Sequence, residues 1–323
     1  MYLKEKYRGT VMKILILGAG ALGSLMADEL LRAGHGVTLL ARGGRYWELK
    51  EQGLVVRHYL QFYNSCTRPV VVDQVPEGAV YDAAFCVLQY TQLAVATETF
   101  AKANAGIYVL VGNNPDPEET SKHFAACGGD TGRLLFAFFG AGGRREKGKA
   151  ISVHTKRVSL TAGALSGGGG LKESLQNILS GSHIRLYWEA DMAAWLFYHL
   201  TIVVPVARGI YAKDGNLHAL AGDKALLKTL ILAAREAMKA LKLLGIRHEA
   251  TERALDTSDQ KLIRLLWILF HTPLGRLIAG DHAMSAKGEM AALGAALDAR
   301  VDGAPEGMTF SSYLALKRFQ PEA

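Results

Sequence analysis

Two stretches of the sequence hold residues whose types and spacing suit chemistry. Gly18, Gly20 and Gly23 take the spacing GxGxxG, which suits the binding of a dinucleotide pyrophosphate. Far along the chain, WLFYHLTIVVP over residues 195–205 sets one ionisable side chain, His199, in an otherwise apolar and aromatic run. An imidazole there can donate a proton to a reacting group, or it can be a neutral side chain satisfied by one structural contact.

The surroundings of the glycines decide what they can do. Residues 13–42 read as a strand, a glycine turn, a helix and a second strand, which is a complete βαβ unit. Gly18 permits the tight turn, Gly20 lets a pyrophosphate approach the backbone, and Gly23 lets the helix pack on the strand. The N-terminus of the helix supplies N–H donors for the anion. The predicted contacts of the loop are Gly18, Gly20, Ala21, Leu22 and Gly23.

The residues after the second strand indicate which dinucleotide is bound. NAD-binding versions of this unit place an acid there, but this chain has Arg42, with Arg45 one turn later. A guanidinium can hold a 2′-phosphate through two parallel hydrogen bonds. The pattern therefore favours NADP(H) over NAD, and the alternative is that both arginines are solvated loop residues.

The composition limits the class of protein. The chain has 323 residues, 50% of them hydrophobic and 21% charged, which is typical of a folded protein of two domains. The net charge of +7 comes from scattered Lys and Arg, so anionic small ligands are favoured and nucleic acid is not expected. The three cysteines have no metal-ligand spacing, so we expect no metal site and a reducing cytoplasm.

The N-terminus and the longest uncharged run bear on location. The first residues are polar and precede an apolar strand too short for a signal peptide, so we expect a cytoplasmic protein. The run from Met192 to Ala207 contains His199 and Pro205 and is shorter than the roughly 20 apolar residues of a membrane span. It is predicted to be a buried helix, with no membrane partner.

The pattern of apolar residues predicts the fold class. We expect an α/β protein in which an N-terminal Rossmann-type doubly wound parallel sheet is followed by an all-helical C-terminal domain. Residues 1–188 would form the first domain and 189–323 the second. A hairpin at the sheet edge is predicted over residues 150–162. The other expected strands are 70–72, 83–88, 108–111 and 134–139, and the expected helices are 191–212, 222–245, 258–270 and 280–299.

These features together resemble one known family. The GAGALG loop of residues 18–23, ARGGR at residues 41–45, and a long apolar helix after Tyr187-Trp188-Glu189 are similar to the ketopantoate reductase (2-dehydropantoate 2-reductase) family. The resemblance implies an NADPH-binding Rossmann domain, a helical second domain, and reduction of a 2-keto acid to a 2-hydroxy acid.

The resemblance also assigns roles in the first domain. Gln89 stands where the family has a lysine near the cofactor, and Gln92 matches the family's glutamine. Asn113 falls on an asparagine that lies near nicotinamide and substrate. The resemblance thus implies cofactor contacts at Gln89, Gln92 and Asn113. From the residues alone, Asn113 lies in a turn at a strand end, which is where open α/β sheets bind ligands.

In the second domain the chain departs from the family. Aligned on the preceding tryptophan, His199 takes the position of the catalytic lysine, while Val203 and Ala207 take those of two substrate-binding asparagines. Arg208 stands where the family has proline. A site tuned to the polar groups of its substrate rejects mismatches strongly, so these changes predict a different substrate.

A second set of polar residues lies near the C-terminus. In DHAMSAKGEM, residues 281–290, helical spacing puts His282, Ser285, Ala286 and Glu289 on one face. The resemblance places Glu289 close to a substrate-binding glutamate, whereas Leu277 stands at the family's serine. We expect Glu289 to bind substrate or to orient His199, and the other reading is a solvated charged face.

The sequence therefore predicts an NADPH-dependent oxidoreductase that reduces a small carbonyl substrate, with His199, Asn113 and Glu289 as catalytic residues. The alternative is a non-catalytic NADP(H)-binding sensor or regulatory protein. A nucleic-acid binder is the third hypothesis, and the lack of a continuous basic face disfavours it. The apolar run of residues 262–270 is a possible homodimer contact.

Overall fold

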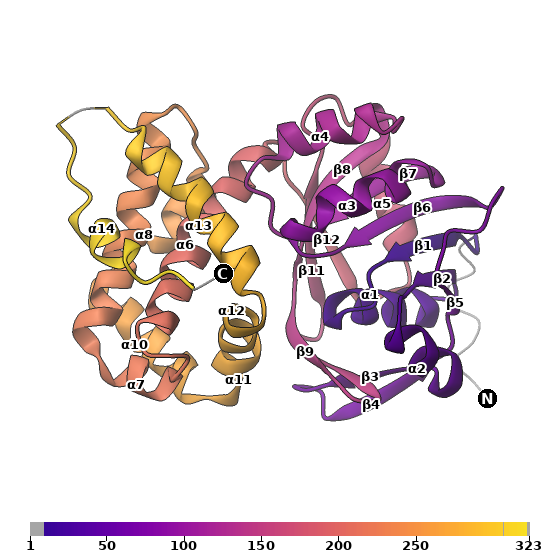
Figure 1. Cartoon of the computed structure of the whole chain (residues 1–323), viewed down its shortest axis with the longest axis horizontal. Coiled ribbons are helices and arrows are strands. Elements are labelled where there is room, and N and C mark those ends of the chain that lie inside the picture. The colour runs from indigo at the N-terminus through magenta and orange to yellow at the C-terminus, as the bar shows by residue number, and fades with distance from the viewer. Residues whose placement is uncertain (1–9, 306, 322–323) are drawn as a thin grey trace. The chain divides into compact units, whose positions relative to one another are not determined.

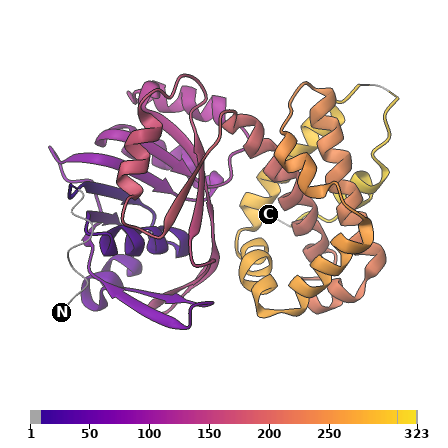
Figure 2. The same ribbon diagram turned by 180° about the vertical axis from the view of Figure 1, so that it is seen from behind.

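Residues 10–305 and 307–321 are described by the computed structural model shown in Figures 1 and 2. The chain divides into two compact units. The first comprises residues 10–112 and 117–192, and the second comprises residues 113–116 and those from 193 onward. The predicted domain boundary after residue 188 falls at the end of a strand, shortly before the second unit begins.

The first unit is built on an eight-stranded sheet with the order β12-β11-β8-β7-β6-β1-β2-β5. The strands from β5 to β8 in that order are all parallel, and β11 runs antiparallel to β8. The predicted fold class is confirmed. The strands are β1 (Lys13–Leu17), β2 (Gly36–Leu40), β5 (Val70–Val72), β6 (Val80–Val87), β7 (Asn104–Val111), β8 (Leu134–Gly140), β11 (Val158–Gly163) and β12 (Ile184–Trp188).

The order of the strands creates a point where ligands can bind. From β1 the chain continues to β2 and β5 on one side, and then returns to place β6, β7 and β8 on the other side. Leu17 and Cys86 are paired near the carboxyl ends of β1 and β6. Ligands of open α/β sheets bind where the strand order reverses in this way.

The core explains why β1 forms at the centre. Ile14, Leu15 and Ile16 are fully buried, as expected of a parallel strand covered on both faces. Helix α1 (Ala21–Arg32) follows directly and buries Leu25 and Met26. The other helices of this unit are α2 (Gly44–Gln52), α3 (Tyr90–Ala101), α4 (Pro117–Ala126), the short 3-10 turn Thr131–Arg133 and α5 (Leu171–Leu179).

A second, four-stranded sheet was not predicted. Its order is β4-β3-β10-β9, with β3 (Leu54–His58), β4 (Tyr63–Thr67), β9 (Gly142–Glu146) and β10 (Lys149–Val153). The hairpin predicted over residues 150–162 is therefore wrong, because β10 pairs with β9 and β3 while β11 pairs with β8 and β12. Both runs bury apolar residues, but each does so in a different sheet.

Helix α1 contacts strands of both sheets, and buried polar groups mediate part of this packing. On the second sheet, the Nε2 atom of His58 lies 3.3 Å from Oδ2 of Asp28 on α1. The Nδ1 atom of the same imidazole lies 2.9 Å from Nε2 of His154. All three side chains are buried, and the His58 ring also lies within hydrogen-bond distance of Ser65 through Nε2, at 2.9 Å.

Helices and turns without β-strands make up the described residues of the second unit. It contains α6 (Met192–Tyr211), α7 (Leu217–Gly222), α8 (Lys224–Leu243), α9 (Glu249–Leu255), α10 (Asp259–His271), α11 (Pro273–Gly275), a π turn (η2, Arg276–Gly280), α12 (Asp281–Ser285), α13 (Lys287–Asp302) and α14 (Ser311–Lys317). In Figure 1 this unit is coloured orange to yellow. The prediction of a single helix over residues 280–299 is wrong, because non-helical backbone at Ala286 separates α12 from α13.

Helix α6 agrees with the helix predicted over residues 191–212. It has 20 residues and is long and apolar enough to cross a membrane, as is the bent pair Asp259–His271 and Pro273–Ser285 taken together. In α6, 61% of the most apolar window is buried inside the protein. Near its C-terminal end, Arg208 forms a buried ion pair of 2.8 Å with Asp298 of α13. A buried core helix can be as long and as apolar as a membrane span. The length of α6 therefore does not distinguish between the two.

Candidate active site

Two of the three loop glycines are required by sterics. Gly18 has φ +110°, and a Cβ there would overlap the carbonyl oxygen of Val87 at the end of β6. A Cβ on Gly23 would overlap the carbonyl oxygen of Gly18. Both positions therefore need glycine, because α1 must pack directly against the turn that follows β1.

Gly20 differs from the other two glycines. It is exposed, it precedes the first residue of α1, and its backbone is extended. A Cβ built on Gly20 meets nothing within 4 Å, and no side chain caps this end of α1. The first N–H groups of a helix have no acceptor within the helix, so those of Ala21 and Leu22 suit an anion. The space beside Gly20 fits the pyrophosphate of a dinucleotide.

The two arginines after β2 have different environments. Arg42 is exposed, whereas Arg45 is only 7% exposed. The Arg45 guanidinium donates to the carbonyl oxygen of Ala19 at 3.3 Å and to Oγ of Ser24 at 3.1 Å, and it lies 3.2 Å from Glu48. Burial lowers the pKa of Arg45, and the Glu48 carboxylate opposes that change. Arg45 thus holds the glycine loop, and Arg42 is the arginine that solvent reaches.

The residues after β6 and β7 lie at the same edge of the sheet. Val87 pairs with Val111 at the ends of these strands, so Leu88 and Gly112 follow side by side. Gln92 accepts a hydrogen bond of 3.2 Å from the backbone N–H of Gln89 through Oε1, at the start of α3. This contact places both glutamines just beyond the carboxyl end of β6.

Asn113 follows Gly112 and belongs to the second compact unit. Its side chain is buried, and its Oδ1 atom accepts no hydrogen bond from the residues that the structure describes. Buried amide groups in folded proteins are nearly always paired. The amide of Asn113 therefore has capacity for a donor supplied by a ligand.

His199 lies on α6 in a largely apolar environment. Its ring stacks on that of Trp195 with 5.1 Å between ring centroids, and its Nε2 atom is buried. Burial lowers the pKa of His199 to about 4, and the nearby His282 acts in the same direction. The imidazole is therefore neutral at pH 7.

His282 and Glu289 are brought together by irregular backbone. The π turn Arg276–Gly280 precedes α12, and Ala286 separates α12 from α13. His282 Nε2 lies 3.4 Å from Oε2 of Glu289. The Glu289 side chain is 3% exposed and that of His282 is 41% exposed. π turns occur often at functional sites, and here the break allows a contact that differs from the uniform helical face predicted.

The second unit thus gathers His199, His282 and Glu289. Sequence reasoning gave His282 a lesser place because its separation from the apolar run of α6 hides their proximity. The positions where the family has polar residues are apolar and buried here, namely Ala207 and Leu277. Within residues 10–305 and 307–321, no three His, Cys, Asp or Glu side chains are grouped to hold a metal.

The sequence of the first unit matches a known protein family. Residues 14–167 match the family model described as ketopantoate reductase PanE/ApbA. This segment includes the glycine loop, both arginines, both glutamines and Asn113. The resemblance seen in the sequence is confirmed over this segment, and solved structures named as ketopantoate reductases share the fold at 13–16% identity. No curated protein sequence matches the chain.

Solved structures extend the likeness of fold over nearly the whole chain. 2-Dehydropantoate 2-reductase from Geobacter metallireducens GS-15 has a TM-score of 0.75 at 14% identity, covering 95% of this chain and 98% of that chain. The D-mandelate dehydrogenase structure with NADH and anilino(oxo)acetate has a TM-score of 0.73 at 16% identity, covering 95% and 96%. Probable 2-dehydropantoate 2-reductase from Bacillus subtilis has a TM-score of 0.66 at 16% identity, covering 95% and 98%.

Proposed function

We propose that this protein is an NADPH-dependent oxidoreductase that reduces a small 2-keto acid to the 2-hydroxy acid. The observation that carries the proposal is the glycine loop at the switch point of the sheet. There, Gly18 and Gly23 are sterically required and Gly20 leaves open space before an uncapped helix. The family match over this segment supports the same activity.

The preference for NADP(H) rests on Arg42. This side chain is exposed just after β2, where NAD-binding relatives of the fold use an acid for the ribose hydroxyls. A 2′-phosphate needs a cation that has no other partner. Arg45 already donates hydrogen bonds to Ala19 and Ser24. A structural relative, D-mandelate dehydrogenase, forms a complex with NADH, so the choice of cofactor differs among proteins of this fold.

The proposed chemistry needs a proton source at the substrate oxygen. A bound nicotinamide would supply the hydride, and negative charge would develop on the carbonyl oxygen. His199 is neutral, so it can donate an N–H hydrogen bond to that oxygen, as neutral imidazoles do in other enzymes. His282 is more exposed and is oriented by Glu289, so it can deliver the proton. Asn113 would bind the substrate through its amide.

The substrate is proposed to differ from ketopantoate. Val203 and Ala207 occupy positions where the family uses asparagines, and Leu277 occupies that of a serine. Apolar side chains cannot satisfy the hydroxyl groups that those polar residues bind. A 2-keto acid with a more apolar side chain fits these replacements better.

The first test is NADPH oxidation with ketopantoate and a panel of 2-keto acids that carry aliphatic or aromatic side chains, measured from about pH 5 to pH 8. Turnover that is fastest with an apolar 2-keto acid supports the proposal. Tight NADPH binding without turnover on any member would instead favour a non-catalytic NADP(H) sensor. Faster turnover with NADH than with NADPH would overturn the assignment to Arg42.

Assembly and location are part of the same proposal. The second unit exposes Leu265, Trp267 and Ile268 on α10, and a structural relative from Staphylococcus aureus is described as a dimeric ketopantoate reductase. We propose a cytoplasmic homodimer that uses this part of the helical unit. Light scattering on the wild-type protein and on Trp267→Glu would show a change from dimer to monomer.

A further inference from the structure

The segment Asn113–Asp116 belongs to the second compact unit, although the residues on either side of it belong to the first. The segment carries Asn113, whose side chain is buried and whose Oδ1 atom has no donor among the described residues. Holding four residues in one conformation costs conformational entropy, so the segment needs contacts that keep it in place.

Arg300 on α13 supplies such contacts. Its Nη2 atom donates to Oδ1 of Asp116 at 3.0 Å and to the carbonyl oxygen of Pro115 at 3.5 Å. Its Nη1 atom donates to the carbonyl oxygen of Ala296, earlier on the same helix, at 3.2 Å. The guanidinium is planar and its donors have fixed directions, so contacts to two consecutive residues fix the orientation of the segment as well as its position.

The guanidinium of Arg300 is itself held against α6. Its Cζ atom lies 4.1 Å from the centroid of the Phe197 ring, within the range of about 6 Å for a cation–π contact. The side chain of Arg300 is 26% exposed and that of Asp116 is 38% exposed, and an ion pair of this exposure contributes little alone. The ring and the Ala296 carbonyl keep the guanidinium in one place. The segment is thereby anchored to the helix that also carries His199.

A turn inside the segment links its anchored end to Asn113. The backbone N–H of Asp116 donates to Oδ1 of Asn114 at 3.0 Å. This side-chain bond to the backbone two residues later closes an Asx turn. Asn114 is only 3% exposed, so the turn is packed inside the protein. A shift of the Asp116 carboxylate would therefore move the backbone beside Asn113.

We propose that Arg300 is a positioning residue for the reaction. It holds the segment Asn113–Asp116 on the helical unit, so that the amide of Asn113 meets the substrate at a fixed place relative to α6. Arg300 itself does not touch the substrate. The inference rests on the proposed function, in which Asn113 binds the 2-keto acid. A displacement of about 1 Å in such a group can cost about 100-fold in rate, so losing the anchor should weaken the use of the keto acid.

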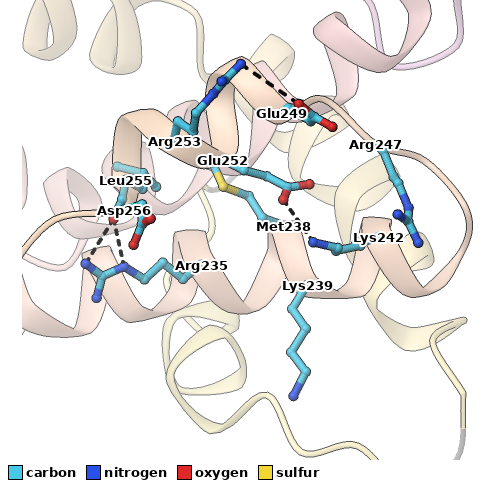
Figure 3. Close-up of a pocket in the computed structure, with 10 residues that line it drawn as sticks. All are labelled: Arg235, Met238, Lys239, Lys242, Arg247, Glu249, Glu252, Arg253, Leu255 and Asp256. Atoms are coloured by element: carbon cyan, nitrogen blue, oxygen red, sulfur yellow. Dashed lines mark hydrogen bonds and ion pairs between the residues drawn. The ribbon is translucent and has the colours of Figure 1, made fainter.

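Two substitutions and one control test the proposal. Arg300→Met removes the charge and the hydrogen bonds, and Arg300→Lys keeps a cation for Asp116. The control is Arg235→Met on α8, because Arg235 is 31% exposed and lies 2.5 Å from Asp259. Arg235 also donates to the carbonyl oxygen of Leu255, as Figure 3 shows, so the two arginines have the same kinds of partner. A general loss of stability should appear in both methionine variants.

The first measurement is amide hydrogen exchange of the ligand-free protein, followed by mass spectrometry on peptides that span residues 113–116. We expect exchange in these peptides to be about tenfold faster in Arg300→Met than in the wild type, because the segment opens more often. Arg300→Lys and Arg235→Met should exchange as the wild type does there. This readout needs no substrate. Unchanged exchange in Arg300→Met would overturn the anchoring role.

The second measurement is steady-state kinetics with the best 2-keto acid of the panel. The KM for the keto acid should rise about tenfold or more in Arg300→Met, with the KM for NADPH nearly unchanged, and Arg300→Lys should restore most of the loss. Arg235→Met should leave both KM values as in the wild type. Fast exchange with an unchanged KM for the keto acid would overturn the positioning role and leave the reductase standing. Absence of turnover in the wild type would overturn the proposed function and the positioning role with it, whereas the exchange data would still report the anchor.

Discussion

The Nε2 atom of His282 lies 3.4 Å from a carboxylate oxygen of Glu289, although the two residues belong to different helices. Glu289 is buried, while His282 keeps 41% of its side chain exposed. His199 is near enough to His282 for the two imidazoles to disfavour simultaneous protonation. The arrangement therefore provides one neutral imidazole and one that a carboxylate orients.

The first prediction concerns the source of the proton. We expect His282→Gln and Glu289→Gln to lower kcat by about 100-fold or more, which is typical of the loss of a general acid, with the KM for NADPH unchanged. His199→Gln, which keeps a neutral hydrogen-bond donor, should lower kcat less. Steady-state kinetics with the best substrate measure this, and Lys287→Gln at the exposed start of α13 is the control. A fully active His282→Gln with an inactive His199→Gln would assign the proton to His199.

The second prediction concerns acid stability. An unfolded His199 takes up a proton below about pH 6.5, whereas the buried side chain does so only near its pKa of about 4. The folded state is therefore favoured by its neutral His199 above pH 6.5, and this contribution to stability is lost as the pH falls from 6.5 towards 4. The loss amounts to about 2–3 kcal/mol.

Urea unfolding of the wild-type protein and of His199→Gln at pH 7 and near pH 4.5 measures this contribution. We expect the free energy of unfolding to fall less for His199→Gln than for the wild type over this interval, because glutamine does not titrate. Other ionisable groups are common to both proteins and cancel in the comparison. Parallel losses of stability in the two proteins would show that His199 titrates normally when folded.

The third prediction separates the two arginines. Arg42→Met should raise the KM for NADPH by about 10- to 100-fold and leave that for NADH nearly unchanged, because only the 2′-phosphate is affected. Arg45→Met removes the hydrogen bonds to Ala19 and Ser24 that hold the glycine loop. It should therefore weaken NADPH and NADH alike. The ratio of the two KM values measures this, and a selective loss of NADPH in Arg45→Met would contradict the structural role.

The fourth prediction uses added methyl groups in the glycine loop to test whether NADPH binds there. Gly20→Ala should fold with nearly unchanged stability, since its Cβ meets no protein atom and its φ is −71°. The methyl group would stand in the space for the pyrophosphate, so NADPH affinity should fall at least tenfold. Gly23→Ala should instead lower the melting temperature, because its Cβ overlaps the carbonyl oxygen of Gly18. Equal NADPH affinity in Gly20→Ala and the wild type would argue that the dinucleotide does not bind at this loop.

Much of the fold could be predicted because its signals are local. The strand, glycine turn and helix of residues 13–32 lie within one stretch, and apolar periodicity marks α6 and α8 in the same way. The second sheet consists of two local hairpins, β3–β4 and β9–β10, and the pair that joins them into one sheet is distant in sequence. Ala150 of β10 pairs with Val56 of β3, and no local pattern records that register. The same reason explains the wrong hairpin, since two adjacent strands need not pair with each other.

The sequence by itself determined that a GxGxxG loop joins a strand to a helix, and that one histidine lies in an apolar helix. It also marked the departures from the family at Val203 and Ala207. Only the tertiary structure decided the charge of His199, because its pKa depends on burial and on His282, which lies far along the chain. The structure likewise assigned Arg45 to the loop and left Arg42 exposed. Desolvation and contacts between distant residues control the charge of His199 and the roles of the two arginines. The local spacing of residues in the sequence predicts neither effect.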